Sequence, residues 1–371
     1  MLTGLLLVLL AQGVTDNSIL IGMEGAANSF SVDEENLGMR LVIKHVNASG
    51  GVHGRLIHER AYPRGTQDSV DQAVRNAIRL VEQDKVFLLF NFGGPAAVRI
   101  GAYAMQHDVP YLFPHTALLT VDGDRHVFTS YPRYAGESRL MLEFLVHDRQ
   151  AKRIAVIHAP NVYGRYFAER AETLAGDIGY EFVGAEPLAL QPDDAVDEMA
   201  ALRKHNPDVV VMALYPAGAR RVIEAKAALH WSVALVSSGP LTDEQYLNID
   251  GGYADGTLGF CYYPDPNASD APGIVEYRRL MAEYFPGYAL NRYSLYGYVF
   301  GRLIVEGLER AGPELTEDAF LDAMESIEGW DSGGILPPVS FSASDHHAQT
   351  AGFVCELRGG RFRPLTGWIS P

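Results

Sequence analysis

The sequence predicts an α/β protein with two lobes, each a doubly wound parallel sheet covered by helices on both faces. Three observations predict this fold. Short apolar runs bounded by glycine or proline recur along the chain, as expected for strands buried on both faces. Between them lie stretches whose apolar residues have helical spacing. The second half repeats this alternation, and 371 residues are enough for two such lobes.

The first half alternates in the order β-α-β-α-β-α-β. Strands are expected at residues 19–23, 55–61, 86–92 and 109–113, and helices at 33–48, 69–83 and 95–106. The helix at 69–83 is typical, because Val70, Val74 and Val81 recur at helical spacing and give it one apolar face.

The second half repeats the same architecture after residue 128. Helices are expected at 137–148, 165–178, 195–205 and 217–228, and strands at 153–158, 181–187, 208–214, 233–237 and 257–262. Further helices are expected at 274–284, 294–310 and 318–326, followed by short strands at 339–341, 353–357 and 361–365. The last two strands are joined by a turn at Arg358-Gly359-Gly360, which favours a hairpin.

One β-α-β unit, residues 86–116, organises the first lobe. Its strands end at Gly93-Gly94-Pro95 and at His115-Thr116, and Pro95 suits the first turn of a helix. Because the two strands are parallel and expected to be neighbours, both turns should lie at the same edge of the sheet. In open α/β sheets this is the edge at which ligands bind.

Charge and the N-terminal residues restrict the class of protein. The net charge of −16 disfavours nucleic acid and anionic membranes as partners, because both bind basic surfaces. Residues 1–11 contain the apolar run Leu5–Leu10 followed by Ala11, which indicates a secretory signal, although no lysine or arginine precedes it. The alternative is a buried N-terminal strand. The run is too short to span a bilayer, and no cysteine follows it to carry a lipid.

Two cysteines, Cys261 and Cys355, lie in strand-like runs. In an exported protein they can form one disulfide. They can equally remain two buried thiols that pack as small apolar groups. The sequence leaves both interpretations open.

Catalytic signatures are missing from the sequence. It contains no GxSxG, GxxxxGK[ST] or HExxH motif, and no GxGxxG motif after a strand. His346-His347 lies in a polar loop without the further ligands that a tetrahedral metal site needs. We therefore expect no enzymatic activity, no metal and no cofactor.

Tyrosines recur at the expected strand ends and connections. They are Tyr131, Tyr134, Tyr163, Tyr215, Tyr262 and Tyr263. A tyrosine offers an apolar face and a hydroxyl, which suits a cleft that closes on a small organic ligand. Packing in the core and at hinges is the alternative explanation for each of them.

Seven segments, in order along the chain, carry a resemblance to a known family. They are GVTDNSILIG (13–22), IKHVNASGGVHGR (43–55), RLVEQDKV (79–86), VPYLFP (109–114), KRIAVIHAPNVYGR (152–165), SLYGYVFGRLIVEGLERAG (294–312) and VSFSASDH with GGRFRPLTGW in the tail (339–368). With these segments the chain resembles type I periplasmic solute-binding proteins, related to the leucine/isoleucine/valine-binding protein of branched-chain amino-acid ABC importers. Each segment is weakly specific, but the ordered set is specific.

The resemblance implies two lobes joined by three crossover segments, which close over a ligand. Lobe 1 would comprise residues 12–132 and 264–342, and lobe 2 residues 133–263 and 343–371, after a signal at 1–11. The crossovers would lie near 131–134, 263–266 and 342–350. The protein would be a periplasmic monomer that delivers a small molecule to an ABC permease in the inner membrane.

The resemblance also implies where the ligand binds. In amino-acid-binding members, the first lobe holds the α-carboxylate with backbone N–H groups and a Ser/Thr pair, and the second lobe supplies a tyrosine and an acid for the ammonium. The matching candidates in lobe 1 are Asn28, Ser29, Gly93, Gly94, Pro95, His115, Thr116 and Ala117. Those in lobe 2 are Tyr163, Tyr215, Gly239, Pro240 and Leu241.

The sequence departs from this pattern at the residues that would bind an amino acid. The loop FNFGGPAA lacks the usual hydroxyl residues, Thr116 is the only hydroxyl in its turn, and the first loop, GAANSFSV, replaces a turn with glycine and proline. Leu241 stands where an acid is expected, although Asp243 and Glu244 lie close by in sequence. An ammonium without a carboxylate partner would cost about 1–3 kcal/mol. An ordinary α-amino acid is therefore not the expected ligand.

The expected ligand is a carboxylic acid, an amide, an aromatic compound or another small metabolite. His115 can bond a carboxylate or a carbonyl, or its ring can instead bond the backbone of its own loop. The expected function is capture for an ABC importer. The alternative is a sensor that delivers its ligand-bound form to a chemoreceptor or a histidine kinase, and an enzyme on the same scaffold is less favoured.

Overall fold

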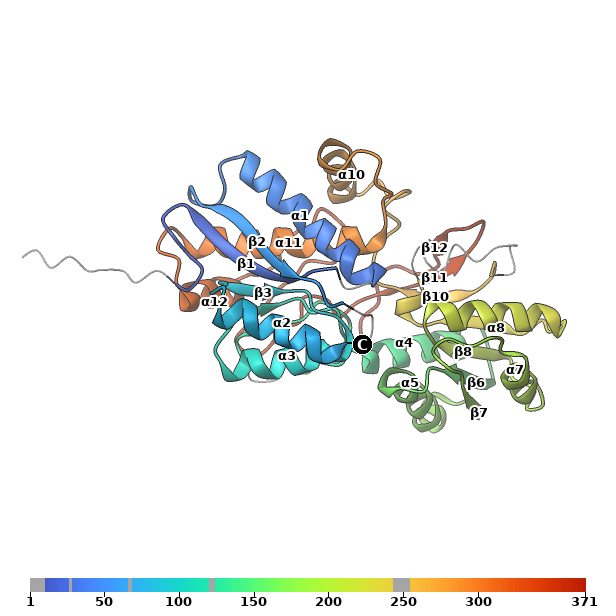
Figure 1. Cartoon of the computed structure of the whole chain (residues 1–371). Coiled ribbons are helices and arrows are strands. Elements are labelled where there is room, and N and C mark those ends of the chain that lie inside the picture. Colours follow the sequence, from blue (N-terminus) through green and yellow to red (C-terminus); the bar gives the residue numbers. More distant parts are fainter. Residues whose placement is uncertain (1–10, 27–28, 66–68, 120–123, 243–253) are drawn as a thin grey trace, which may run out of the picture. The chain divides into compact units, whose positions relative to one another are not determined.

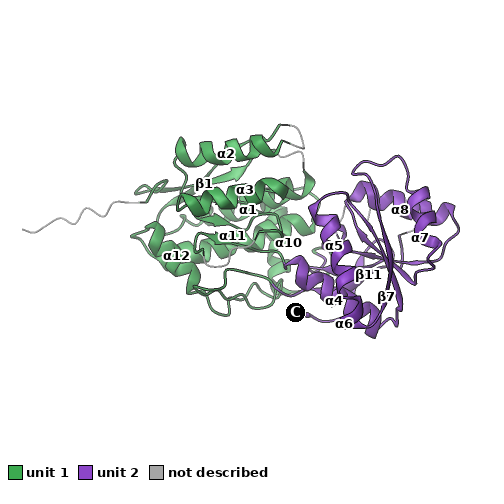
Figure 2. Ribbon diagram, turned by 90° about the horizontal axis from the view of Figure 1, so that it is seen from below, with its two compact units in different colours: residues 1–131, 266–349 green, residues 132–265, 350–371 purple. Residues whose placement is uncertain are grey.

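The computed structural model describes residues 11–26, 29–65, 69–119, 124–242 and 254–371. The chain divides into two compact units, shown in Figure 2. Unit 1 comprises residues 1–131 and 266–349, and unit 2 comprises residues 132–265 and 350–371. The chain therefore passes from one unit to the other three times. By this division residues 343–349 group with unit 1, where His347 forms a parallel bridge with Thr129.

Unit 1 contains a five-stranded parallel sheet in the order β2-β1-β3-β4-β5. The strands are β1 (Ser18–Glu24), β2 (Leu56–Tyr62), β3 (Leu88–Phe90), β4 (Tyr111–Leu112) and β5 (Val127–Phe128). Two of them are shorter than the sequence predicts. The reason is that Asn91 and Phe113 have φ angles of 51° and 54°, so the backbone leaves the extended conformation directly after β3 and β4.

Helices cover both faces of this sheet (Figure 1). They are α1 (Phe30–Ala48), α2 (Val70–Glu82), α3 (Gly94–Gln106), α10 (Pro272–Tyr284), α11 (Arg292–Ala311) and α12 (Glu317–Glu325). Helices α1 and α11 pack against each other on one face, and α2 and α3 pack together on the other. Side chains cap several N-termini, as when Ser69 accepts the Gln72 N–H at the start of α2.

Two glycines allow α1 and α11 to cross at unusually short range. A Cβ atom at Gly38 would overlap the Ser294 carbonyl oxygen, and one at Gly297 would overlap the Glu35 carbonyl oxygen. Any larger residue at either position would therefore push the two backbones apart. The crossing lies directly beside Glu35, so it fixes the position of that residue against the rest of unit 1.

Unit 2 contains a seven-stranded sheet in the order β12-β11-β10-β9-β8-β6-β7. Five strands are parallel, namely β6 (Arg153–His158), β7 (Glu181–Pro187), β8 (Val209–Ala213), β9 (Ala234–Ser237) and β10 (Leu258–Cys261). The tail adds β11 (Phe353–Leu357) antiparallel to β10, and β12 (Phe362–Pro364) antiparallel to β11, as the hairpin turn predicts. The strand expected at 339–341 is not formed, since Val339 makes only an isolated bridge with Trp330.

Successive residues of the central strands of unit 2 pack into two hydrophobic clusters, one on each face of the sheet. On β6, Ile154 and Val156 pack into one cluster, while Ala155 and Ile157 pack into the other. The clusters are covered by the helices α4 (Tyr134–His147), α5 (Val162–Thr173) and α6 (Ala175–Ile178), and by α7 (Val196–Arg203) and α8 (Pro216–Ala228). This is why the strand reads as a continuous apolar run. Within the described residues, no helix is long and apolar enough to cross a membrane.

A disulfide joins Cys261 of β10 to Cys355 of β11. It covalently connects the tail hairpin to the parallel part of the sheet. Both cysteines are fully buried, so the bond lies in the core of unit 2. Of the two interpretations that the sequence left open, the structure shows the disulfide.

We expect Gly297→Ala to lower the free energy of unfolding by about 1–3 kcal/mol, because the new methyl group overlaps the α1 backbone. Gly176→Ala is the matched control, since a Cβ atom there meets nothing within 4 Å, and alanine favours a helix. Thermal and urea unfolding of the three proteins measure the difference. Equal stability of Gly297→Ala and the wild type would show that the close crossing is wrong.

We expect replacement of both cysteines by alanine to cost about 2–4 kcal/mol, because the disulfide closes a long loop with a sequence separation of 94. Urea unfolding of the wild type with and without reductant should reproduce most of the same loss. A double variant as stable as the oxidised wild type would contradict the expectation.

Candidate functional site

The turns after β3 and β4 lie side by side at one edge of the sheet in unit 1. Gly93 and His115 form an isolated parallel bridge, in which the His115 N–H donates to the Phe92 carbonyl and the Gly94 N–H donates to the His115 carbonyl. The expected proximity of the two turns is therefore observed. The first loop holds two further candidates. Ser29 directly precedes α1, whereas Asn28 lies outside the described residues.

The backbone N–H groups of Gly93 and Gly94 have acceptors within unit 1. The Gly93 N–H donates to the Glu24 carboxylate at 3.2 Å, and the Gly94 N–H donates to the His115 carbonyl at 3.2 Å. The family resemblance implied that these groups hold the ligand. In this structure a ligand would first have to displace a buried carboxylate and a carbonyl oxygen, which leaves side chains as the better candidates.

A buried ion pair, Glu24 with Arg64, lies beside Gly93. Two hydrogen bonds of 2.5 and 2.7 Å join the guanidinium to the two carboxylate oxygens, and Arg64 also donates to the Gly93 carbonyl at 3.2 Å. Burial raises the pKa of the Glu24 carboxyl above its ordinary value, although Arg64 opposes the shift. Sequence reasoning missed this pair. The available signal was a charged residue at or within two residues of the end of each of the first two strands.

A second buried acid, Glu35, lies behind His115. The His115 Nδ1 atom is 2.6 Å from Glu35 Oε1, and the Tyr131 hydroxyl donates to the same oxygen at 2.7 Å. Glu35 is fully buried, whereas a quarter of the His115 side chain is exposed. The His115 Nε2 atom has no hydrogen-bond partner among the described residues. Sequence reasoning placed His115 correctly at the edge but missed Glu35.

The remaining candidates of unit 1 are less suited to hold a ligand. The Thr116 side chain is buried, and its hydroxyl accepts the Leu118 N–H at 3.1 Å within its own turn. Pro95 is exposed in the first turn of α3, and Ala117 follows Thr116 without a polar side chain. Among the described candidates of this edge, the side chain of His115 is a quarter exposed, and its Nε2 atom has no hydrogen-bond partner among the described residues.

Arg64 and His115 each pair with a buried acid of unit 1, Glu24 and Glu35 respectively. A Cβ atom built on Gly93 would lie 3.8 Å from both Arg64 Nη2 and His115 Cδ2, so the two basic groups flank this glycine. Their acids, Glu24 and Glu35, are fully buried. We call Gly93, Arg64 and His115 with these two acids the unit 1 half-site. Its two carboxylates are fully buried, whereas a quarter of the His115 side chain is exposed.

The corresponding edge of unit 2 is lined by aromatic rings. The Tyr163 ring lies 5.2 Å from that of Tyr134 and 5.6 Å from that of Tyr215. Tyr163 is 4% exposed and its hydroxyl is hydrogen-bonded to the Ser238 hydroxyl, whereas Tyr215 is 41% exposed. Val162 beside them is 60% exposed. We call these residues the unit 2 aromatic cluster.

A carboxylate also lies at this edge of unit 2, but it comes from an unexpected element. Leu241 and Gly239 are fully buried in a short 3-10 turn (Gly239–Leu241) that also holds Pro240. Glu137 of α4 accepts the Gly239 N–H at 2.7 Å and the Tyr262 hydroxyl. A Cβ atom at Gly239 would overlap the Tyr262 ring, so the turn needs glycine there. Asp243 and Glu244 lie outside the described residues.

Glu137 titrates near neutrality. Burial raises the pKa of its carboxyl from 4.5 to about 7, and the hydrogen bonds from Tyr262 and Gly239 only partly oppose this. The carboxylate therefore holds the turn in place rather than offering a charge at the surface. Sequence reasoning placed Glu137 at a helix start and gave it no further role.

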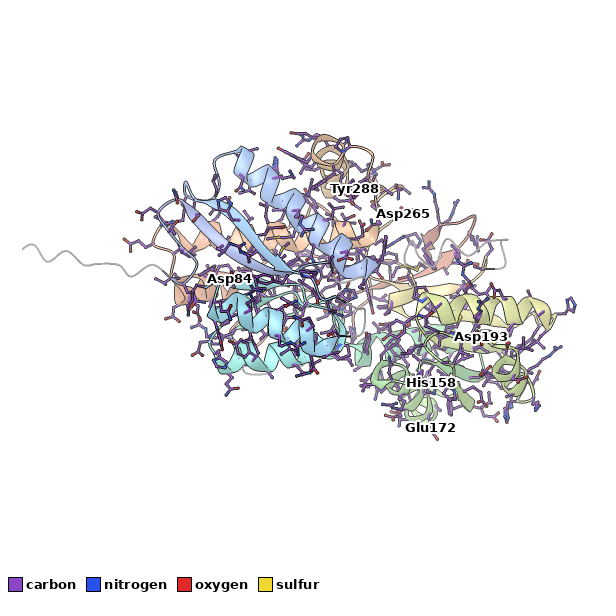
Figure 3. The ribbon with its side chains drawn as sticks, viewed as in Figure 1. Asp84, His158, Glu172, Asp193, Asp265 and Tyr288 are labelled. Carbon is purple, nitrogen blue, oxygen red and sulfur yellow. A yellow bond between two sulfur atoms is a disulfide. The ribbon has the colours of Figure 1, made fainter. Side chains whose placement is uncertain are left out.

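His158 at the end of a strand, and His346 and His347 in a loop, pack or bond within the described residues. His158, labelled in Figure 3, ends β6 and donates from Nδ1 to the Ala159 carbonyl at 2.9 Å. His346 stacks on Phe128 at a centroid distance of 4.1 Å, and His347 bonds Asp345 at 3.0 Å. No group of three or more potential metal ligands occurs in the part of the chain that the structure describes.

We expect Glu137 to make stability depend on pH. The folded pKa lies above the unfolded value, so this contribution is complete below about pH 4.5 and is lost as the pH rises through about 7. The shift of the Glu137 pKa from 4.5 to about 7 corresponds to about 3 kcal/mol of folding free energy. Urea unfolding between these pH values measures it, and Glu137→Gln should remove most of the slope. An unchanged slope in that variant would contradict the assignment.

Comparison with known proteins places this chain in a family. A model for the family described as "Periplasmic binding protein" matches residues 19–361. The "Leu/Ile/Val-binding protein homolog 7" of Brucella abortus (strain 2308) is 24% identical over 298 residues, which cover 75% of this chain and 73% of that protein.

Solved structures agree with this result. The branched chain amino acid ABC transporter protein from Thermus thermophilus with bound valine has a TM-score of 0.85 at 16% identity, covering 96% of this chain and 98% of that one. The fatty acid ABC transporter substrate-binding protein from Thermomonospora curvata has a TM-score of 0.84 at 18% identity, covering 98% and 95%. At such identities the likeness shows the fold alone, and it confirms the two-lobe α/β fold. Because the family model spans most of its length, the chain belongs to the periplasmic binding protein family, as a type I member related to the Leu/Ile/Val-binding proteins.

Proposed function

We propose that this protein is the solute-binding component of an ABC importer and that it captures a small organic carboxylate with an apolar or aromatic body. It would be exported to the periplasm and would deliver its ligand to a permease in the inner membrane. Binding would involve no covalent chemistry. Each unit would contribute one half of the binding residues, as lobe closure in this fold requires.

The observation that carries this proposal is which side chains of the unit 1 half-site are exposed and which are buried. His115 is its exposed polar side chain, and the two nearby acids are buried behind the basic groups. A carboxylate is a good acceptor for such a donor, and the bond is strengthened by charge. An α-ammonium group would find both carboxylates already engaged, by Arg64 and by His115.

The unit 2 aromatic cluster supports an apolar or aromatic body. Tyr215 and Val162 expose apolar surface, and Tyr163 packs beneath them. Tyrosine rings of this kind bind flat or aliphatic groups and keep a hydroxyl for one directed contact. Glu137 does not offer a charge to an ammonium, because both of its oxygens accept hydrogen bonds within unit 2.

The names of the relatives are compatible with this choice. One solved relative holds valine, and the other is named for fatty acids. These two kinds of ligand have a carboxylate and an aliphatic part in common. The carboxylate is the feature that we transfer to this chain, since the acids described beside the two sets of turns, Glu24, Glu35 and Glu137, are all buried and already bonded.

A thermal-shift screen tests the proposal. It should contain carboxylic acids, their primary amides and the matching α-amino acids. A carboxylate that binds should raise the melting temperature increasingly with its concentration, because at a hundred times its dissociation constant it stabilises the folded protein by about 2.7 kcal/mol. Stabilisation confined to α-amino acids would contradict the proposal, and so would turnover of any compound that binds.

We expect Tyr215→Ala to weaken binding of the best carboxylate by about tenfold, because it removes an exposed ring of the aromatic cluster. The matched control is Tyr288→Ala, which removes a ring that is 57% exposed on unit 1, away from the half-site residues. Isothermal titration calorimetry measures both affinities. Equal affinity for both variants would exclude Tyr215 from the binding residues.

A further inference from the structure

Glu35 differs from the other buried acid of the unit 1 half-site in how its charge is compensated. The Glu24 charge is matched by the guanidinium of Arg64 through two hydrogen bonds. No arginine or lysine forms an ion pair with Glu35 among the described residues, where its partners are His115 and Tyr131. Its second oxygen, Oε2, is buried and has no hydrogen-bond partner there. The imidazole of His115 is therefore the group that can offset this charge.

The hydrogen bonds determine which atom of His115 faces outward. A carboxylate oxygen only accepts, so the Nδ1 atom, 2.6 Å from Glu35 Oε1, carries a hydrogen. Nε2 is then the atom left for a ligand. In the neutral ring with its hydrogen on Nδ1, Nε2 is an acceptor. In the ring with hydrogens on both nitrogens Nε2 is a donor, and only this form also offsets the charge of the buried carboxylate, so it is the form on which the inference rests. The matching ligand group is an acceptor, and an anionic acceptor is preferred.

Several contacts hold this arrangement rigidly. The His115 ring meets the Tyr131 ring edge-on at 5.2 Å, and Tyr131 stacks on Tyr296 at 5.1 Å. Tyr296 in turn donates to the Phe113 carbonyl at 2.9 Å, just before the turn that carries His115. On the other side, Gly297 packs against the backbone of Glu35 itself. Acid, tyrosine and histidine are thus held by three separate elements.

We propose that Glu35, assisted by Tyr131, is a positioning residue that makes the unit 1 half-site selective for an anionic head group, by holding His115 with a donor Nε2–H directed outward. This inference rests on the proposed function. It predicts that the protein binds a carboxylate more tightly than the primary amide of the same shape, and that this preference depends on Glu35. Neither Thr116 nor the backbone N–H groups are needed for this discrimination.

Glu35→Gln tests the proposal, with calorimetric affinities for the best carboxylate of the screen and for its primary amide. We expect the carboxylate to bind about tenfold more weakly to the variant and the amide to change by less than about threefold. The ratio of the two affinities should therefore fall. The matched control is Glu34→Gln, which removes the same charge from the preceding residue of α1. The Glu34 carboxylate accepts a hydrogen bond from Asn291. This control variant should leave the ratio unchanged.

Two further measurements keep the test decisive. The ¹⁵N NMR shifts of the His115 ring should show a hydrogen on Nδ1 in the wild type and a changed protonation pattern in Glu35→Gln. Tyr131→Phe removes one hydroxyl donor from Glu35 and should lower the ratio in the same direction, so it serves if Glu35→Gln does not fold. An unchanged ratio in the folded variants, or an unchanged ¹⁵N pattern, would overturn the inference alone. A wild type that binds no carboxylate would overturn the proposed function, and the inference with it.

Discussion

The close crossing of α1 and α11 is the constraint on which the candidate site of unit 1 depends. Two backbones approach each other where Gly38 and Gly297 leave no side chain between them. This contact brings the first turns of α1 against α11, and Glu35 lies at that point. A carboxylate is thereby buried behind His115 without a strong cation of its own. The packing of α1 on α11 thus sets which charge lies behind His115, although neither helix carries that histidine.

Both units bury acids beside the turns that end their strands, and both use them to hold backbone or basic groups. Glu24 accepts the Gly93 N–H, and Glu137 accepts the Gly239 N–H. In unit 1 the acid thus occupies a backbone donor that the family resemblance would assign to a ligand. In unit 2 Glu137 holds the turn at which the resemblance places an acid for the ammonium. Buried carboxylates with such partners are costly to leave unpaired, so they fix the turns firmly. The side chains left at least partly exposed there are His115 in unit 1 and Tyr215 in unit 2.

Much of the fold followed from local pattern. Most of the order of strands and helices, the hairpin at the tail and the neighbouring turns after β3 and β4 could be predicted, because strand burial and turn chemistry are visible in short stretches. The short strand β5 was not predicted, and the strand expected at 339–341 is not formed. The exact ends of β3 and β4 could not be predicted, because the left-handed backbone conformations of Asn91 and Phe113 leave no signal in the sequence. His115 was placed correctly for the same local reason. Its partner Glu35 was missed because the two are 80 residues apart.

The sequence by itself determined the family, the alternation that makes two parallel sheets, and the absence of an acid at Leu241. These are properties of residue order and of single positions. Only the tertiary structure decided that Cys261 and Cys355 are bonded, that Glu137 supplies a buried carboxyl to the turn of Gly239, and that Glu35 stands behind His115. The physical reason is that a charge acts through distance and burial. Both are set by which helices and strands pack together, and no local pattern records them.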